Sequence, residues 1–90
     1  MLVTRIPPED AEAARLRHLD QARQALVAAT RVSEVKQIRD RAAALQQYAR
    51  QQQYSLAIQN DAAELKLRAE RRAGELLHEM EKAKAAPGNQ

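Results

Sequence analysis

The chain has 90 residues, a net charge of +3 and no cysteine, and Tyr48 and Tyr54 are its only aromatic residues. This length allows one small domain, and the lack of cysteine excludes disulfide bridges and thiolate metal sites. No apolar run approaches the about 18 residues of a membrane span, and the N-terminus does not resemble a signal peptide. We therefore expect a cytoplasmic protein without a membrane partner.

The residues from Glu9 to Ala73 include no glycine or proline and are mostly strong helix formers. This composition predicts an all-α protein. Alanine supplies much of the 44% hydrophobic content and buries little area per residue, so the core of one chain is thin. Such a chain usually gains stability from a partner, and we expect a homo-dimer or binding to a partner helix.

The first helix is predicted over residues 8–29, after an extended lead-in over 1–7. Pro8 suits the first turn of a helix, and the acidic residues that follow it suit the positive end of the helix dipole. Leu16, Leu19 and Leu26 recur at helical spacing and predict the buried side of this helix.

The second helix is predicted over residues 33–52. No glycine marks the end of the first helix, so the boundary depends on Ser33 or Thr30 as the capping residue of the second. A heptad-like apolar stripe, which includes Val35, Ile38 and Leu45, follows this cap.

The apolar stripe changes phase near Ser55, and a new stripe begins at Ile58. A phase change fits either a helical hairpin or one continuous helix with a rotated face. The start and stop signals favour the hairpin, with a third helix over 55–82 and a flexible tail or linker over 85–90.

The three predicted helices form a single helical domain over residues 8–84. Its fold is an antiparallel helical hairpin or three-helix arrangement with coiled-coil-like packing. The predicted interaction core consists of the larger residues of the stripes: Leu16, Leu19, Leu26, Val35, Ile38, Leu45, Ile58, Leu65, Ala69, Leu76 and Met80.

Gly74 lies inside the third predicted helix, where it costs about 1 kcal/mol of helix stability relative to alanine. Two interpretations fit this residue. It allows the backbone of another helix to come close, or it is a tolerated weak position.

Residues with catalytic potential are few. Glu75 and His78 have the spacing of one half of a di-iron site in a helical bundle, but the pair occurs only once. Ser33 and Lys36 match a nucleophile pair by spacing, but a capping role accounts for Ser33. We therefore predict no enzyme activity, no metal, no other cofactor and no small-molecule substrate.

Two groups of cations are candidates for phosphate contact. Acidic residues interleave with the second group, so an exposed helix surface with ion pairs is the favoured interpretation. A nucleic-acid-binding accessory protein is the alternative. The candidate residues are Lys36, Arg39, Arg41 and Arg50 in the first group, and Arg68, Arg71 and Arg72 in the second.

Three segments resemble a known pattern. They read VSEVKQIRDRA over residues 32–42, YARQ over 48–51 and AELKLRAERRAGELL over 63–77. They are similar to the N-terminal helical region of uncharacterised bacterial and prophage proteins, which are often found among phage or mobile-element genes. The resemblance covers roughly residues 26–82.

The resemblance has two implications. Relatives often carry a small residue near the position of Ser55, which favours a hairpin. They also tend to continue, past the position of Gln90, into a segment that looks like a small DNA-binding module. The resemblance implies no established chemistry. We therefore expect a non-enzymatic helical oligomerisation or protein-interaction module of a phage or mobile-element protein.

Overall fold

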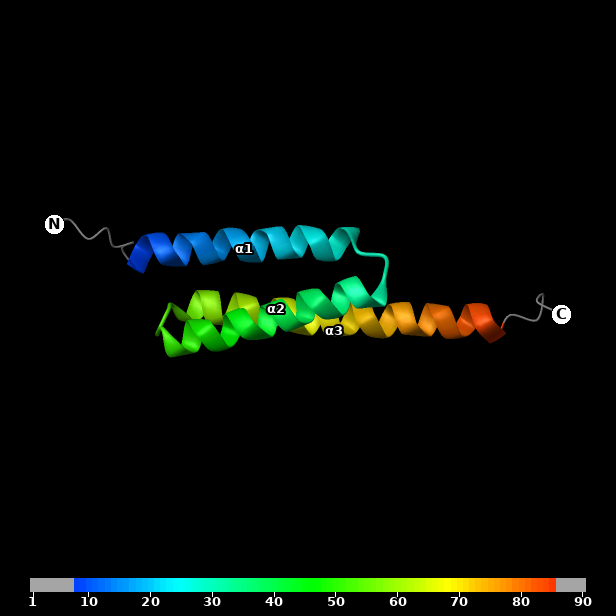
Figure 1. The fold of residues 1–90 in the computed structure, drawn as a ribbon. Coiled ribbons are helices and arrows are strands. Elements are labelled where there is room, and N and C mark those ends of the chain that lie inside the picture. Colours follow the sequence, from blue (N-terminus) through cyan, green and yellow to red (C-terminus); the bar gives the residue numbers. More distant parts are fainter. Residues whose placement is uncertain (1–7, 86–90) are drawn as a thin grey trace.

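The computed structural model describes residues 8–85, which form a bundle of three helices (Figure 1). These are α1 (Pro8–Ala28), α2 (Val32–Gln51) and α3 (Leu56–Ala85). Helix α2 runs antiparallel to α1 and α3, and α3 continues past the start of α2. The all-α, three-helix arrangement is thus confirmed. The predicted lead-in over 1–7 and the last part of the predicted tail, 86–90, lie outside the described residues.

The α2–α3 turn settles the choice between a hairpin and a continuous helix in favour of the hairpin. Gln53 has a positive φ of 55°, and its N–H donates to the carbonyl of Arg50 at 3.1 Å. The N–H of Tyr54 donates to the carbonyl of Ala49 at 2.9 Å. These two bonds are those of a Schellman motif, which ends a helix with one left-handed residue.

Ser55 caps α3, as predicted for the start of the third helix. Its hydroxyl oxygen accepts a hydrogen bond from the N–H of Ile58 at 3.4 Å. The backbone N–H of Ser55 itself donates to the carboxylate of Glu12 in α1 at 2.9 Å. This contact places a negative charge at the positive end of α3, where the helix dipole favours it.

The predicted cap of α2 was wrong. The helix begins at Val32, so Ser33 lies inside its first turn, and no side chain bonds from the capping position. The backbone N–H of Arg31 instead donates to the carboxylate of Glu34 at 3.1 Å. Glu34 thus satisfies one of the exposed backbone groups with which every helix begins.

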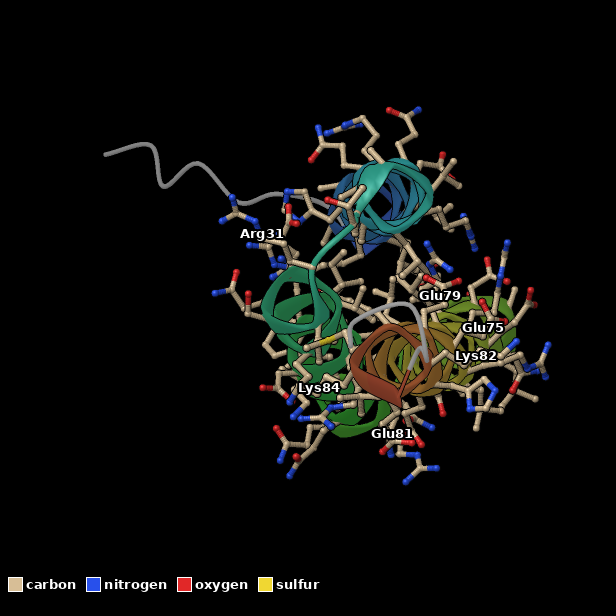
Figure 2. All side chains as sticks on the ribbon, turned by 90° about the vertical axis from the view of Figure 1, so that its right-hand side faces the viewer. Arg31, Glu75, Glu79, Glu81, Lys82 and Lys84 are labelled. Atoms are coloured by element: carbon tan, nitrogen blue, oxygen red, sulfur yellow. The ribbon has the colours of Figure 1, made fainter. Side chains whose placement is uncertain are left out.

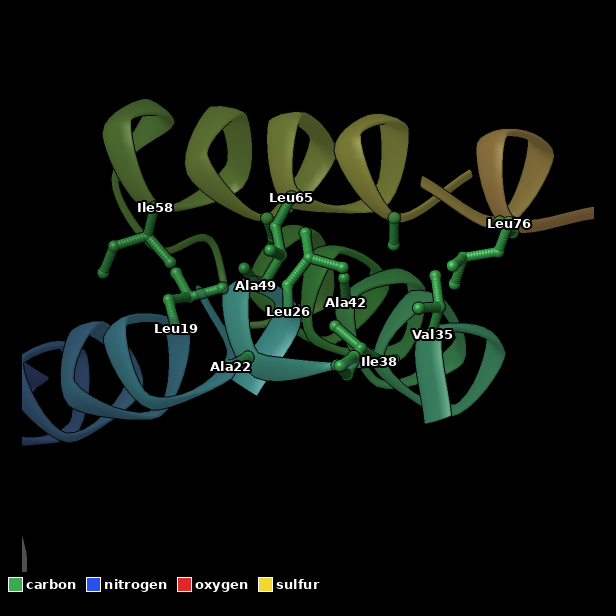
Figure 3. Close-up of a cluster of buried hydrophobic side chains, with 14 residues drawn as sticks. Leu19, Ala22, Leu26, Val35, Ile38, Ala42, Ala49, Ile58, Leu65 and Leu76 are labelled. Carbon is green, nitrogen blue, oxygen red and sulfur yellow. The ribbon is translucent and has the colours of Figure 1, made fainter. Parts of the chain in front are cut away.

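The core lies between the three helices, where apolar side chains from each helix converge (Figure 3). Most of the predicted core residues are in it, because buried positions follow the helical period. The buried predicted residues are Leu19, Leu26, Val35, Ile38, Ile58, Leu65, Ala69 and Leu76, and Leu45 packs against them half-buried. Further core members are alanines: Ala22, Ala29, Ala42, Ala49, Ala62 and Ala73.

Two predicted core residues, Leu16 and Met80, are exposed instead, with 40% and 51% of their surface accessible. Leu16 lies beside the inward-facing side of α1, which is occupied near its start by Arg15. Met80 lies near the end of α3, where it lines an open groove together with Val32, the first residue of α2.

Polar and aromatic contacts hold the first half of α1 in place. The guanidinium of Arg15 lies 4.8 Å from the centre of the Tyr48 ring, a distance at which a cation is attracted to the ring face. The rings of Tyr48 and Tyr54 meet edge to face, 5.9 Å apart. Within the described chain, the Nε of Arg15 is buried without a hydrogen-bond partner.

Candidate interaction surfaces

Large apolar side chains that the bundle does not bury are the first candidates for a functional surface. Four of them belong to α3, two to α1 and one to α2, so the unburied apolar surface is concentrated on α3. In the described part of the chain they are Leu16, Val27, Tyr48, Leu56, Leu67, Leu77 and Met80.

Helix α3 carries a second apolar stripe on its outer side. Leu56, Leu67 and Leu77 are 71%, 61% and 43% exposed, and Ala63 between them is half-buried. At about 100° per residue, these positions lie roughly 140° around the helix from the core stripe. Sequence reasoning missed this stripe, although Leu56, Ala63 and Leu77 already stand at multiples of seven residues.

Gly74 lies on the same outer side of α3 as Leu67. A Cβ built at Gly74 meets no atom within 4 Å. No other part of the described chain therefore requires a glycine at this position. Of the two interpretations of Gly74, close approach of another helix within this chain is excluded.

A mostly apolar groove lies where the end of α3 passes the α1–α2 connection. Its volume is about 420 Å³. Figure 2 looks onto this end of the bundle and shows the charged side chains of α3 around it. The groove is lined by Thr30, Arg31, Val32, Leu76, Glu79, Met80 and Ala83.

The structure brings the second cationic group together. Arg68, Arg71 and Arg72 line an open pocket of about 270 Å³ beside the end of α1. Arg72 pairs with Glu75 at 3.2 Å, and Arg68 lies 3.8 Å from Glu64. Two of the three charges are therefore partly neutralised, which weakens the pocket as an anion site.

The first cationic group is divided between two sides of α2. Arg41 lies beside α1, where it lines a pocket with His18 and Gln21. Lys36, Arg39 and Arg50 share a different side by helical spacing, and Arg39 pairs with Asp40 at 2.9 Å. The predicted phosphate contacts thus lie on several sides of the bundle and form no continuous basic surface.

The residues with catalytic potential lie in open surroundings. Glu75 and His78 are exposed on α3, as Ser33 and Lys36 are on α2. Within residues 8–85, no three His, Cys, Asp or Glu side chains come together as metal ligands. None of the polar or charged residues whose burial is described is buried. No helix in this part of the chain is long and apolar enough to cross a membrane.

No protein-family model, curated protein or solved structure matches this chain. The similarity to the helical region of prophage proteins therefore stays a prediction.

Proposed function

We propose that this protein is a non-enzymatic helical oligomerisation module, which holds two copies of itself together through helix–helix contact. The observation that carries the proposal is the second apolar stripe of α3, on which three leucines remain exposed after the bundle has formed. Following the resemblance, the protein assembled in this way belongs to a phage or another mobile element.

The composition of the bundle core supports this proposal. Seven of its buried residues are alanines, and each contributes less buried apolar area than a leucine. A contact that covers Leu56, Leu67 and Leu77 adds leucine side chains to the buried apolar surface. At about 25 cal/mol per Å² of apolar area removed from water, this is a substantial gain for a small domain.

Sedimentation of the whole chain over a range of concentrations tests the proposal. We expect the mass to rise from that of a monomer to that of a dimer as the concentration increases. A monomer that persists from micromolar to near-millimolar concentration contradicts the proposed function.

A second function is favoured by the gathering of Arg68, Arg71 and Arg72 around one pocket. In this alternative, the protein contacts nucleic-acid phosphates with little sequence preference. Its affinity for a short DNA duplex then falls steeply with salt, and reversing the charge of Arg68 and Arg72 abolishes binding. Binding that is unchanged in this variant excludes the pocket as the contact surface, and no binding at low salt excludes the alternative.

A further inference from the structure

We infer that two copies of this chain associate through the outer side of α3, with their α3 helices antiparallel and a two-fold axis beside Leu67. This inference rests on the proposed oligomerisation and specifies its surface and geometry. The contact surface is the outer α3 stripe, which consists of Leu56, Asn60, Ala63, Leu67, Glu70, Gly74 and Leu77.

The outer α3 stripe has the spacing of a helix–helix seam. Its positions alternate at intervals of four and three residues, as the inner positions of a coiled coil do. The stripe lies on the side of α3 that faces away from α1 and α2. Glu81, one step further along the same stripe, points away from α1 in Figure 2.

An antiparallel pairing about Leu67 matches apolar with apolar residues. Positions at equal distances on the two sides of the axis then face each other across the pair. Leu67 meets the same residue of the second copy, and Leu56 comes within one residue of the level of the partner's Leu77. Three leucine contacts are formed in this way, one on the axis and one at each end.

The charges beside the stripe are complementary in this arrangement. Glu64 comes within one residue of the level of the partner's Arg71, and Lys66 within two residues of the level of the partner's Glu70. Side chains lean toward the N-terminus of their own helix, so in an antiparallel pair the members of each of these pairs lean toward each other. The two-fold axis repeats both pairs, so four ion pairs are formed. A parallel pairing would instead place each of these residues beside its own copy, with like charges together. The charge pattern thus favours the antiparallel orientation.

The same charged side chains form few ion pairs within one chain. Lys66, Glu70 and Arg71 form no ion pair with any described residue, and Glu64 reaches Arg68 only at 3.8 Å. These side chains are therefore available to a second copy at little cost to the fold. Rearranging the exposed Glu64–Arg68 pair also costs little, because such pairs contribute weakly to stability.

Small residues let the two helices come close. Gly74 comes level with the partner's Asn60, and Ala63 comes within one residue of the level of the partner's Glu70. The absence of a side chain at Gly74 leaves space for the amide of Asn60, which would otherwise be crowded in the seam. The free space around Gly74 within one chain agrees with a role in contact with a second chain.

Sedimentation equilibrium of surface variants tests this geometry. Leu67→Glu places two like charges at the axis, and we expect the dimer dissociation constant to rise at least about 100-fold. Because Leu67 is exposed in the monomer, the helical content stays that of the wild type. Val27→Glu, at an exposed position of α1, is the matched control and leaves the dimer intact.

The outcomes separate the surface from the function. If Leu67→Glu still forms the dimer while Met80→Glu does not, the groove at the end of α3 is the interface and the inference is overturned. The proposed oligomerisation survives in that case. If the wild-type chain is itself monomeric, the proposed function fails, and the inference fails with it.

A charge exchange tests the antiparallel orientation. Arg71→Glu brings two acids together in each of two places and weakens the dimer about tenfold. Adding Glu64→Arg to the same chain restores opposite charges in an antiparallel dimer, and we expect most of the affinity to return. A double variant that dimerises no better than Arg71→Glu overturns the antiparallel orientation.

Discussion

The turn between α2 and α3 offers a sharp test of the folded chain, because it holds Gln53 at a φ of 55°. This is the left-handed region, which costs an ordinary L-residue about 1–2 kcal/mol. Glycine adopts it freely and is the residue most often found at this position of a Schellman motif. We therefore predict that Gln53→Gly stabilises the fold.

The size of the gain follows from two opposing effects. Glycine removes the strain of about 1–2 kcal/mol, but it also makes the unfolded chain more flexible, which costs about 0.5–1 kcal/mol. The predicted net gain is about 0.5–1 kcal/mol. For a domain of this size, the midpoint of thermal unfolding then rises by about 2–8 °C.

Thermal and urea unfolding followed by circular dichroism measure this gain, at one low protein concentration so that association does not contribute. The matched control is Gln52→Gly, because Gln52 has an ordinary φ of −86°. This control gains no stability, since there is no strain for glycine to relieve. A loss of stability in Gln53→Gly, or an equal gain in both variants, would refute the reasoning.

Three further predictions concern the core, the caps and the outer α3 stripe. Leu65→Ala, at a position only 1% exposed, lowers the free energy of unfolding by about 2–4 kcal/mol in urea denaturation. The control Val27→Ala changes this free energy by less than about 0.5 kcal/mol, and similar losses in both variants would contradict the observed core. Ser55→Ala lowers the midpoint of thermal unfolding by the equivalent of about 0.5–1 kcal/mol, and Ser33→Ala leaves it nearly unchanged; the reverse order would place the cap at Ser33. Gly74→Ala stabilises the isolated monomer by about 1 kcal/mol but weakens the dimer in sedimentation. An unchanged dissociation constant of the dimer would show that the two α3 helices do not come close at this position.

The sequence was most informative about positions that repeat with the helical period. Ile38 and Leu65 were predicted to be buried from their spacing alone, and both are in the core. The hairpin was favoured because the stripe changes phase near Ser55, and the structure places the turn there. These features depend on neighbours along one helix, so the local sequence contains them.

Features that depend on how the helices face each other were predicted less well. Leu16 fitted the apolar period of the first helix, but Arg15 occupies the inner position, beside Tyr48 of another helix. The cations Lys36 and Arg41 were grouped by sequence, yet they lie on different sides of α2. The rotation of each helix within the bundle decides both cases, and the spacing along one helix does not define it.

The outer α3 stripe was missed for a different reason. Its spacing was visible in the sequence at Leu56, Ala63 and Leu77, but the stronger stripe through Leu65 accounted for the helix by itself. Only the burial of the core stripe shows that the remaining leucines are left exposed. A long helix such as α3 can therefore carry two apolar stripes, one buried in its own bundle and one exposed to a partner.

Disulfide cross-linking tests self-association through α3 most directly. The chain has no cysteine of its own, so an introduced cysteine is the only thiol that can form the cross-link. A single cysteine introduced as Leu67→Cys lies beside its own copy at the two-fold axis, within reach of the Cβ separation of about 3.5–4.5 Å that a disulfide needs. Under mild oxidation we predict rapid and nearly complete cross-linking into dimers, while Val27→Cys stays largely monomeric. Equal and slow cross-linking of the two variants would contradict association through the outer side of α3.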